Sequence, residues 1–253
     1  MNRFLGFAYG LVAYAMFLGA FLYAVGFVSG AWVPKSLDSG ESGDFITSLL
    51  INAALLAVFA IQHSVMARPG FKAWWTRFVP ASIERSTYVV LSSLALGLLY
   101  WQWQPMPEVV WRVEDETGAI ALWALQVTGW LLALASTFAI SHVDLFGLRQ
   151  VYLNLRNQRY VNLPFRISGL YNLVRHPLML GFLIAFWATP YMTVGHLVFS
   201  IATTAYILIA LQIEERDLVN HHGDKYRAYK NEVPMLLPIP HRQRQTRGVF
   251  KET

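Results

Sequence analysis

The chain has 253 residues, of which 55% are hydrophobic, 15% aromatic and only 14% charged, with a formal charge of +5. A soluble domain has about 25% charged residues, so this composition argues against a water-soluble globule and excludes a disordered chain. The charge is too small for a nucleic-acid binder of this size, and the lack of cysteine excludes disulfides, thiolate zinc ligands and a cysteine nucleophile.

Apolar runs long enough to cross about 30 Å of hydrocarbon predict an all-α, polytopic membrane bundle. The runs cover residues 4–28, 45–66, 86–103, 119–140, 178–188 and 194–213. The last two predict a helical hairpin. The run 178–188 is short for a span, so Thr189-Pro190-Tyr191 is either a turn or a kink in one broken helix. Six spans are therefore expected, with five as the alternative.

Charges in the loops predict the orientation of the spans. Segments 67–85 and 141–177 have an excess of Arg and Lys, whereas segments 29–44 and 104–118 have an excess of Asp and Glu. By the positive-inside rule the first two face the cytoplasm and the last two face outward. With six spans, both chain ends are then cytoplasmic.

Nothing divides the chain into separate domains, since it has no internal repeat and no low-complexity segment. We expect one membrane-embedded domain over residues 1–240, followed by a basic cytoplasmic tail at 241–253. The domain would consist of a four-span bundle at 1–140 and a hairpin with a lid at 165–240. The lid is segment 233–240, which is interrupted by prolines, cannot be a span and is expected to fold back as the edge of a pocket.

Polar residues gather at one end of the predicted spans, where they are energetically costly and therefore candidates for function. The clusters are Gln62-His63-Ser64, Glu84-Arg85-Ser86, Ser141-His142-Val143-Asp144, Arg175-His176-Pro177 and Glu214-Glu215-Arg216-Asp217. The predicted orientation places all of them at the cytoplasmic face, which indicates one polar pocket there. The alternative is that each cluster caps its own helix.

The hairpin has an unusual distribution of charge. Pro177 suits the first turn of a helix, whose N-terminus attracts a carboxylate or phosphate, and Arg175 adds a cation beside it. Glu214 and Glu215 are expected at a helix C-terminus, where the helix dipole disfavours anions. Either Arg175 or Arg216 compensates them, or a cationic ligand does. A ligand with a carboxylate, an ammonium and a sulfonium would satisfy both ends of the hairpin.

A short polar helix is expected after the hairpin. Tyr226 and Tyr229 are three residues apart and share one of its faces. Their rings are expected to lie toward the membrane or over a ligand. Adjacent His221 and His222 point apart, so no metal site is expected.

These motifs resemble those of a known superfamily. Segment 171–181 with Arg175-His176-Pro177, followed by Glu214-Glu215 and segment 223–229, resembles the C-terminal signature of the isoprenylcysteine carboxyl methyltransferase superfamily of integral membrane methyltransferases. Upstream, segments 62–68, 84–88 and 101–111 resemble the bacterial methanethiol S-methyltransferases and related membrane proteins named for nitrite and nitric oxide reduction.

The resemblance implies S-adenosylmethionine as methyl donor, S-adenosylhomocysteine as its product, methanethiol as acceptor and a bacterial inner membrane as location. It also implies a set of donor-binding residues at the cytoplasmic pocket: Tyr171, Arg175, His176, Pro177, Glu214, Glu215, Tyr226 and Tyr229. Leu178-Met179 departs from the eukaryotic members, which often have an aromatic residue after the proline. This departure argues against a prenyl-peptide acceptor.

Methyl transfer to sulfur needs the attacking thiolate, the methyl carbon and the leaving sulfur in line. An alkyl thiol with a pKa of about 8.5 is mostly protonated at neutral pH, so a base or a cation is expected near the acceptor. His142 and His63 are the candidate bases, with Asp144 as a partner for His142 and Arg85 as the candidate cation. The alternatives are interfacial histidines with structural roles, an Arg85 paired with Glu84 or Asp144, and a thiolate taken directly from solvent.

Three classes of function remain open. The first is a membrane methyltransferase, acting on methanethiol, on another small thiol or on an isoprenylcysteine carboxylate. The second is a non-catalytic accessory membrane protein, which would lack a usable Glu-Glu and Tyr segment. The third is a transporter or haem protein, which would need histidine or charged residues at mid-span. The expected partners are the lipid bilayer and a small thiol, with no nucleic acid and no predicted oligomeric state.

Overall fold

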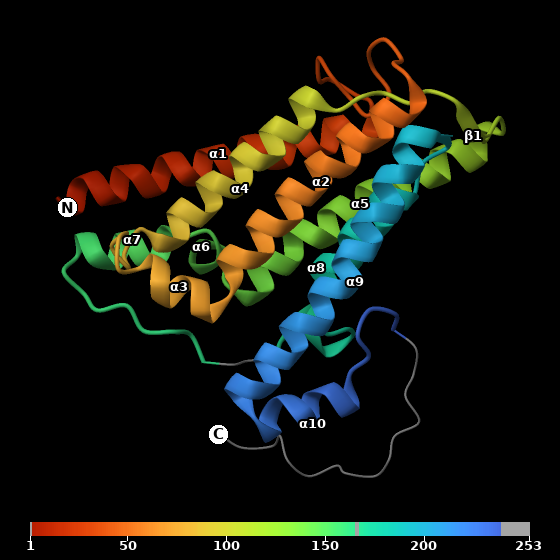
Figure 1. Ribbon diagram of the computed structural model, residues 1–253. Helices are drawn as coiled ribbons and strands as arrows, with labels where there is room; N and C mark the ends of the chain where they lie inside the picture. Colours follow the sequence, from red (N-terminus) through yellow and green to blue (C-terminus); the bar gives the residue numbers. More distant parts are fainter. Residues whose placement is uncertain (1, 165–166, 239–253) are drawn as a thin grey trace.

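The computed structural model describes residues 2–164 and 167–238 and is mostly helical (Figure 1). The helices are α1 (Arg3–Ser29), α2 (Phe45–Ala67), α3 (Pro69–Trp75), α4 (Glu84–Gln102), α5 (Glu116–Ile140), α6 (His142–Leu145), α7 (Leu148–Leu155), the 3-10 helix η1 (Gly169–Asn172), α8 (Pro177–Trp187), α9 (Val194–His222) and α10 (Asp224–Glu232). The strands are β1 (Val109–Arg112) and β2 (Tyr191–Thr193). The tail expected at 241–253 and the end of the lid at 239–240 lie outside the described residues.

Four helices are long and apolar enough to cross a membrane, namely α1, α2, α5 and α9, and the chain is therefore an integral membrane protein. Each begins at a polar side chain that accepts a hydrogen bond from a backbone N–H of the first turn; these are Asn2, Asp44, Asp115 and Thr193.

Helices α4 and α8 occupy the other two expected spans. Helix α4 has 19 residues but is less apolar, and α8 has 11 residues. At 1.5 Å per residue, α8 is roughly 17 Å long, about half of the hydrocarbon thickness. The all-α bundle is confirmed, whereas the number of spans and their orientation stay predictions.

A turn joins α8 to α9, so the alternative of one broken helix is wrong. The Phe186 carbonyl oxygen of α8 accepts hydrogen bonds from His196 Nε2 and Ser200 Oγ of α9, both at 2.8 Å, which shows that α9 returns alongside α8. Strand β2 follows the turn and pairs antiparallel with β1, with Val109 opposite Thr193. The sequence did not predict this small sheet.

Two glycines let α5 and α8 touch along their backbones. A Cβ on Gly129 would lie 2.6 Å from the Ala185 nitrogen, and a Cβ on Gly181 would lie 2.5 Å from the Ala133 nitrogen. Small residues at such an interface allow close helix packing in membranes. Because α8 lies flush against α5, its N-terminus is held beside the end of α5.

The short helices gather at one end of the bundle. Figure 1 shows α3, α6, α7 and α10 at that end and β1 at the opposite end. The candidate residues of the sequence lie on or beside the first group. The end of the bundle that holds α3, α6, α7 and α10 is called the polar end below.

Candidate functional site

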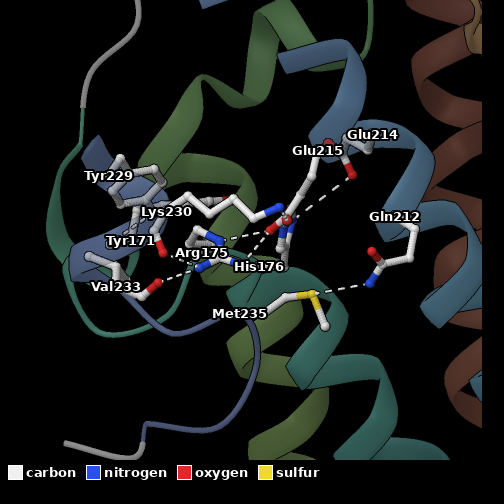
Figure 2. A network of polar contacts seen from close by, with 10 residues as sticks. All are labelled: Tyr171, Arg175, His176, Gln212, Glu214, Glu215, Tyr229, Lys230, Val233 and Met235. Atoms are coloured by element: carbon white, nitrogen blue, oxygen red, sulfur yellow. Dashed lines mark hydrogen bonds and ion pairs between the residues drawn. The ribbon is translucent and has the colours of Figure 1, made fainter. Parts of the chain in front are cut away.

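Glu215 of α9 is the centre of a buried ion-pair cluster at the polar end (Figure 2). Its side chain is 2% exposed. Its Oε1 accepts a hydrogen bond from Nε of Arg175 at 2.7 Å, and lies 2.7 Å from Nη2 of Arg175 and 3.2 Å from Nε2 of His176. Its Oε2 lies 2.8 Å from Nζ of Lys230 in α10. The cluster therefore joins the start of α8 to α9 and α10.

The start of segment 233–238 contacts Arg175 and His176 through its backbone, and its role as a lid stays a prediction. The Arg175 Nη1 donates to the carbonyl oxygens of Lys230, at 2.9 Å, and Val233. The backbone nitrogens of Arg175 and His176 donate to the carbonyls of Pro234 at 2.8 Å and Met235 at 3.1 Å. Most donors of Arg175 are thus used within the protein, and a guanidinium held in this way is rigid.

The predicted helix end at Glu215 is wrong, because α9 continues for two turns to His222. The carboxylate is compensated by Arg175 and by Lys230, which the sequence analysis did not single out. Arg216, the other candidate, is not in the cluster. Lys230 lies one helical turn after Tyr226 in α10, and this spacing places both on the face that meets α9.

The two tyrosines of α10 share a face, as predicted, and both are buried. Their ring centroids are 5.7 Å apart, and the Tyr229 hydroxyl donates to the Tyr171 carbonyl at 2.7 Å. Burial raises the pKa of Tyr229 to about 12, so the hydroxyl keeps its proton. A position facing lipid is therefore wrong for these rings, and contact with a ligand stays a prediction.

Glu214 differs from Glu215 in exposure. Its side chain is 46% exposed, and its carboxylate lies 3.9 Å from Nδ1 of His176. A pocket of about 310 Å³ lies beside the cluster, and Glu215, Arg216, Val219, Asn220 and Lys230 line it. This volume is at the low end of the range of about 300–1,000 Å³ that ligand pockets have.

His142 lies in an aromatic cage. It stacks on Phe138 with ring centroids 4.2 Å apart and contacts Phe17 and Phe146 edge-on. Its Nε2 is 2.7 Å from the Tyr14 hydroxyl and its Nδ1 is 2.7 Å from Thr137 Oγ1. Neither partner was singled out from the sequence, because Tyr14 lies in the middle of an apolar run.

The protons of this contact can be assigned. Thr137 Oγ1 donates to the Leu134 carbonyl at 2.6 Å, so it accepts from Nδ1 of His142. Burial lowers the pKa of His142, so the ring is neutral at pH 7 and has one proton. Nε2 is then unprotonated and accepts from the Tyr14 hydroxyl. The basic nitrogen of His142 therefore points at Tyr14.

Asp144 does not orient His142. Its carboxylate pairs with Arg149 at 3.0 Å and accepts from the Tyr160 hydroxyl at 3.2 Å. Two residues along a helix point about 200° apart, so His142 and Asp144 face different sides. Within the described ranges, Arg85 has no ion pair; its Nε donates to the Leu145 carbonyl at 2.7 Å. The alternative of an ion pair between Arg85 and Glu84 or Asp144 is therefore wrong.

His63 and Arg85 share Tyr88 as a neighbour. The Tyr88 hydroxyl is 2.9 Å from Nε2 of His63, and the Arg85 guanidinium lies 4.9 Å from the centre of the Tyr88 ring. Tyr88 packs in an apolar cluster with Phe17 and Phe146, which also contact His142. The two histidines thus lie on either side of one cluster, without direct contact.

The clusters form two centres and not the single pocket that we expected. One centre joins Arg175 and His176 to Glu214 and Glu215, and the other joins Glu84 and Arg85 to segment 141–144. Tyr171 connects the first centre to the cage of His142. Its carbonyl accepts from Tyr229, and its hydroxyl donates at 3.5 Å to the Ser136 carbonyl, next to Thr137.

Comparison with known proteins shows the family. The model of the NnrU protein family matches residues 50–236. The chain is 57% identical over 242 residues to a methanethiol S-methyltransferase of Mycobacterium tuberculosis, covering 96% of this chain and 99% of that protein. It is 52% identical over 231 residues to one of Crocosphaera subtropica, with 91% of each chain covered.

A more distant relative is Nurim of Mus musculus, which is 31% identical over 187 residues, 70% of this chain and 71% of that protein. No solved structure matches. The NnrU match covers most of the chain, and the identities above 50% extend over more than nine-tenths of it. The chain therefore belongs to the NnrU protein family and to the family of the methanethiol S-methyltransferases.

Proposed function

We propose that this chain is a membrane enzyme that transfers a methyl group from S-adenosylmethionine to methanethiol, with dimethyl sulfide as product. The observation that carries the proposal is the identity of 52–57% to proteins named methanethiol S-methyltransferase over more than nine-tenths of the chain.

The cluster around Glu215 fits a donor site with one modification. Because Arg175 is used by Glu215 and by segment 233–238, it cannot also form a bidentate pair with a ligand carboxylate without breaking those bonds. We assign Arg175 and Glu215 to the rigid frame of the site. His176, Pro177 and the tyrosines at 171, 226 and 229 would complete its walls.

Glu214 is the carboxylate that remains available to a ligand. Its exposed side chain lies at the edge of the cluster, and its carboxylate is 3.9 Å from Nδ1 of His176. The donor has a positive sulfonium and a positive ammonium, so an exposed carboxylate attracts it. When bound, the donor supplies an electrophilic methyl group on sulfur.

His142 is the proposed base for the acceptor. Its unprotonated Nε2 points at the Tyr14 hydroxyl, so a thiol proton would reach Nε2 either directly, with Tyr14 turned away, or through the Tyr14 oxygen. The aromatic cage excludes water and suits a small apolar thiol. His63 with Tyr88 is the second candidate base, and Arg85 beside Tyr88 is the proposed cation that stabilises the thiolate.

Calorimetric titration of the detergent-purified chain with S-adenosylmethionine tests the proposal. We expect one donor bound per chain, displaced by S-adenosylhomocysteine, with weaker binding of the Glu214→Gln variant. The absence of heat and of displacement would contradict an enzyme of this class and would favour the accessory membrane protein.

A further inference from the structure

A second pocket of about 330 Å³ lies at the polar end, away from the cluster around Glu215. Its polar lining comes from α3, α4, α6, α7 and the segment after α7: Lys72, Glu84, Arg85, Asp144, Gln150, Tyr160 and Asn162. Three of these helices, α3, α4 and α6, contribute charged side chains, and the charges are of both signs. Its volume is within the range of about 300–1,000 Å³ of ligand pockets.

The charges of this pocket do not balance. Asp144 is neutralised by Arg149 and is held by Tyr160 and Gln150. Among the described residues, Lys72 and Arg85 have no carboxylate within ion-pair distance. Glu84 in turn has no Lys or Arg side chain from the described part of the chain within that distance. Two cations and one carboxylate leave a net charge of +1, which one monoanion would cancel.

Lys72 and Arg85 are close enough to repel each other. Burial lowers the pKa of Lys72, and the charge of Arg85 lowers it further, while the nearby Glu84 carboxylate offsets part of this decrease. The position of Arg85 is fixed, because its Nε donates to the Leu145 carbonyl and its guanidinium lies over the Tyr88 ring. A phosphate placed against both would relieve the repulsion and use the guanidinium's remaining donors.

A neutral acceptor completes the pocket. The Gln150 amide nitrogen donates to the Asp144 carbonyl at 3.2 Å, whereas its buried Oε1 has no partner among the described residues. A buried acceptor without a partner costs free energy, so this oxygen favours a ligand that brings a hydrogen-bond donor. The pocket thus offers two cations and one acceptor.

The pocket lies where a membrane has its headgroups. Helix α3 follows the apolar helix α2 directly, and its Trp74 side chain and the nearby Phe78 are 47% and 69% exposed. Aromatic rings at the end of a span are typical of the membrane boundary. Lys72 lies on this same short helix. We therefore take a lipid headgroup as the source of the phosphate.

We propose that this pocket binds the phosphate of a phospholipid headgroup between Lys72 and Arg85, with Gln150 accepting from a headgroup hydroxyl or ammonium. The ligand that this pocket would recognise is a phosphate monoanion with a hydrogen-bond donor beside it. Phosphatidylglycerol and phosphatidylethanolamine have such a donor, and phosphatidylcholine does not. The inference shares Arg85 with the proposed methyl transfer, so the variants that test it are made at Lys72 and Gln150, which have no role in that reaction.

Native mass spectrometry of the full chain in detergent, titrated with phosphatidylglycerol, tests the proposal. One basic residue near an anionic membrane surface contributes about 1 kcal/mol, so Lys72→Gln should weaken binding about fivefold. Lys72→Arg should restore it. The matched control is Arg77→Gln, which removes the same charge from an exposed position on the same segment and does not line the pocket. It should change binding less than Lys72→Gln does.

Two further titrations identify the ligand. Phosphatidylcholine should bind more weakly than phosphatidylglycerol, and Gln150→Met should reduce that difference. Displacement of the lipid by millimolar inorganic phosphate would support a site for the phosphate group itself, and its absence would support a headgroup site. Equal losses in the Lys72→Gln and Arg77→Gln variants, or unchanged affinity in Lys72→Gln, would overturn the proposal, since either result describes diffuse surface attraction.

Discussion

Arg175 and Glu215 are 40 residues apart in the chain and form a buried ion pair in which the guanidinium lies 2.7 Å from the carboxylate oxygen. This contact holds the start of α8 against α9, and Lys230 adds α10 to the same carboxylate at 2.8 Å. The pair shapes the pocket beside it while leaving Glu214 exposed. Adjacent glutamates therefore have different tasks.

The first prediction concerns stability. Glu215→Gln leaves Arg175 and Lys230 without a buried counter-charge, and removing one partner of such a pair costs about 3–5 kcal/mol. Glu214→Gln is the matched control, because the same change is made at an exposed position. Thermal unfolding in detergent should show a much lower midpoint for Glu215→Gln and a midpoint near that of the unmodified chain for Glu214→Gln. Equal midpoints for the two variants would contradict the framework role of Glu215.

The affinity for the donor should show the opposite order: among folded variants, Glu214→Gln should weaken donor binding more than Glu215→Gln does. Glu214→Gln removes the carboxylate that we assign to the sulfonium and ammonium of the donor, and a charged hydrogen bond contributes about 1.5–3 kcal/mol, or roughly 10-fold to 150-fold in affinity. Calorimetry at a temperature where every variant is folded gives the measurement. Unchanged donor affinity in Glu214→Gln would contradict the assignment of Glu214 to the donor and would leave other residues of the cluster as its partners.

A third prediction addresses the acceptor base. His142→Ala should lower turnover by the roughly 10²–10⁴-fold typical of a lost general base while leaving donor binding nearly intact. Raising the pH should partly rescue this variant, because solvent then supplies more thiolate. His63→Ala is the comparison, and Tyr14→Phe separates a proton relay from direct transfer. Normal turnover in both histidine variants would leave a thiolate from solvent as the nucleophile.

The pH dependence of stability follows from the cage of His142. Burial lowers its pKa in the folded chain, whereas an unfolded chain binds that proton near its ordinary value of about 6.5. Stability is therefore full above about pH 6.5 and falls as the pH decreases toward the folded-state value. Unfolding midpoints at about pH 7.5 and 5.5 should differ less in His142→Gln than in the unmodified chain. The same difference in both proteins would show that another group titrates.

The orientation can be tested with reporter fusions. Fusions within segment 67–85 and after the C-terminus should be cytoplasmic, and a fusion within segment 104–118 should be outside. A C-terminal fusion that reports outside would reverse the loop assignment or change the number of spans.

The sequence predicted the parts of this site that follow from the cost of polar groups in a membrane. Arg175, Glu214 and Glu215 were found because charges at the end of an apolar run need partners. The break at Pro190 followed from its helix-breaking residues, with a turn and a kink left as alternatives. The end of α9 was misplaced, since the apolar run ends at Ile213 while the helix continues to His222. A change in polarity marks a membrane boundary and not a helix end.

The contacts that the sequence missed join elements far apart in the chain. Tyr14 and His142 are 128 positions apart in the chain. β1 pairs with β2, although all the helices from α5 to α8 lie between the two strands in the sequence. Local sequence patterns do not encode which helices become neighbours. They therefore predict that His142 lies at the polar end, but they do not identify Tyr14 as its partner. Asp144 was assigned to His142 because the two are close in sequence. In the structure, the Asp144 side chain points away from His142 and forms an ion pair with Arg149.

Dimethyl sulfide formation tests the central claim most directly. The purified chain, given methanethiol and S-adenosylmethionine labelled in its methyl group, should release labelled dimethyl sulfide into the headspace, with one S-adenosylhomocysteine formed per product. His142→Ala should bind the donor and form product far more slowly. A folded chain that binds the donor and forms no dimethyl sulfide, while methylating a different thiol or a carboxylate, would contradict methanethiol as the acceptor.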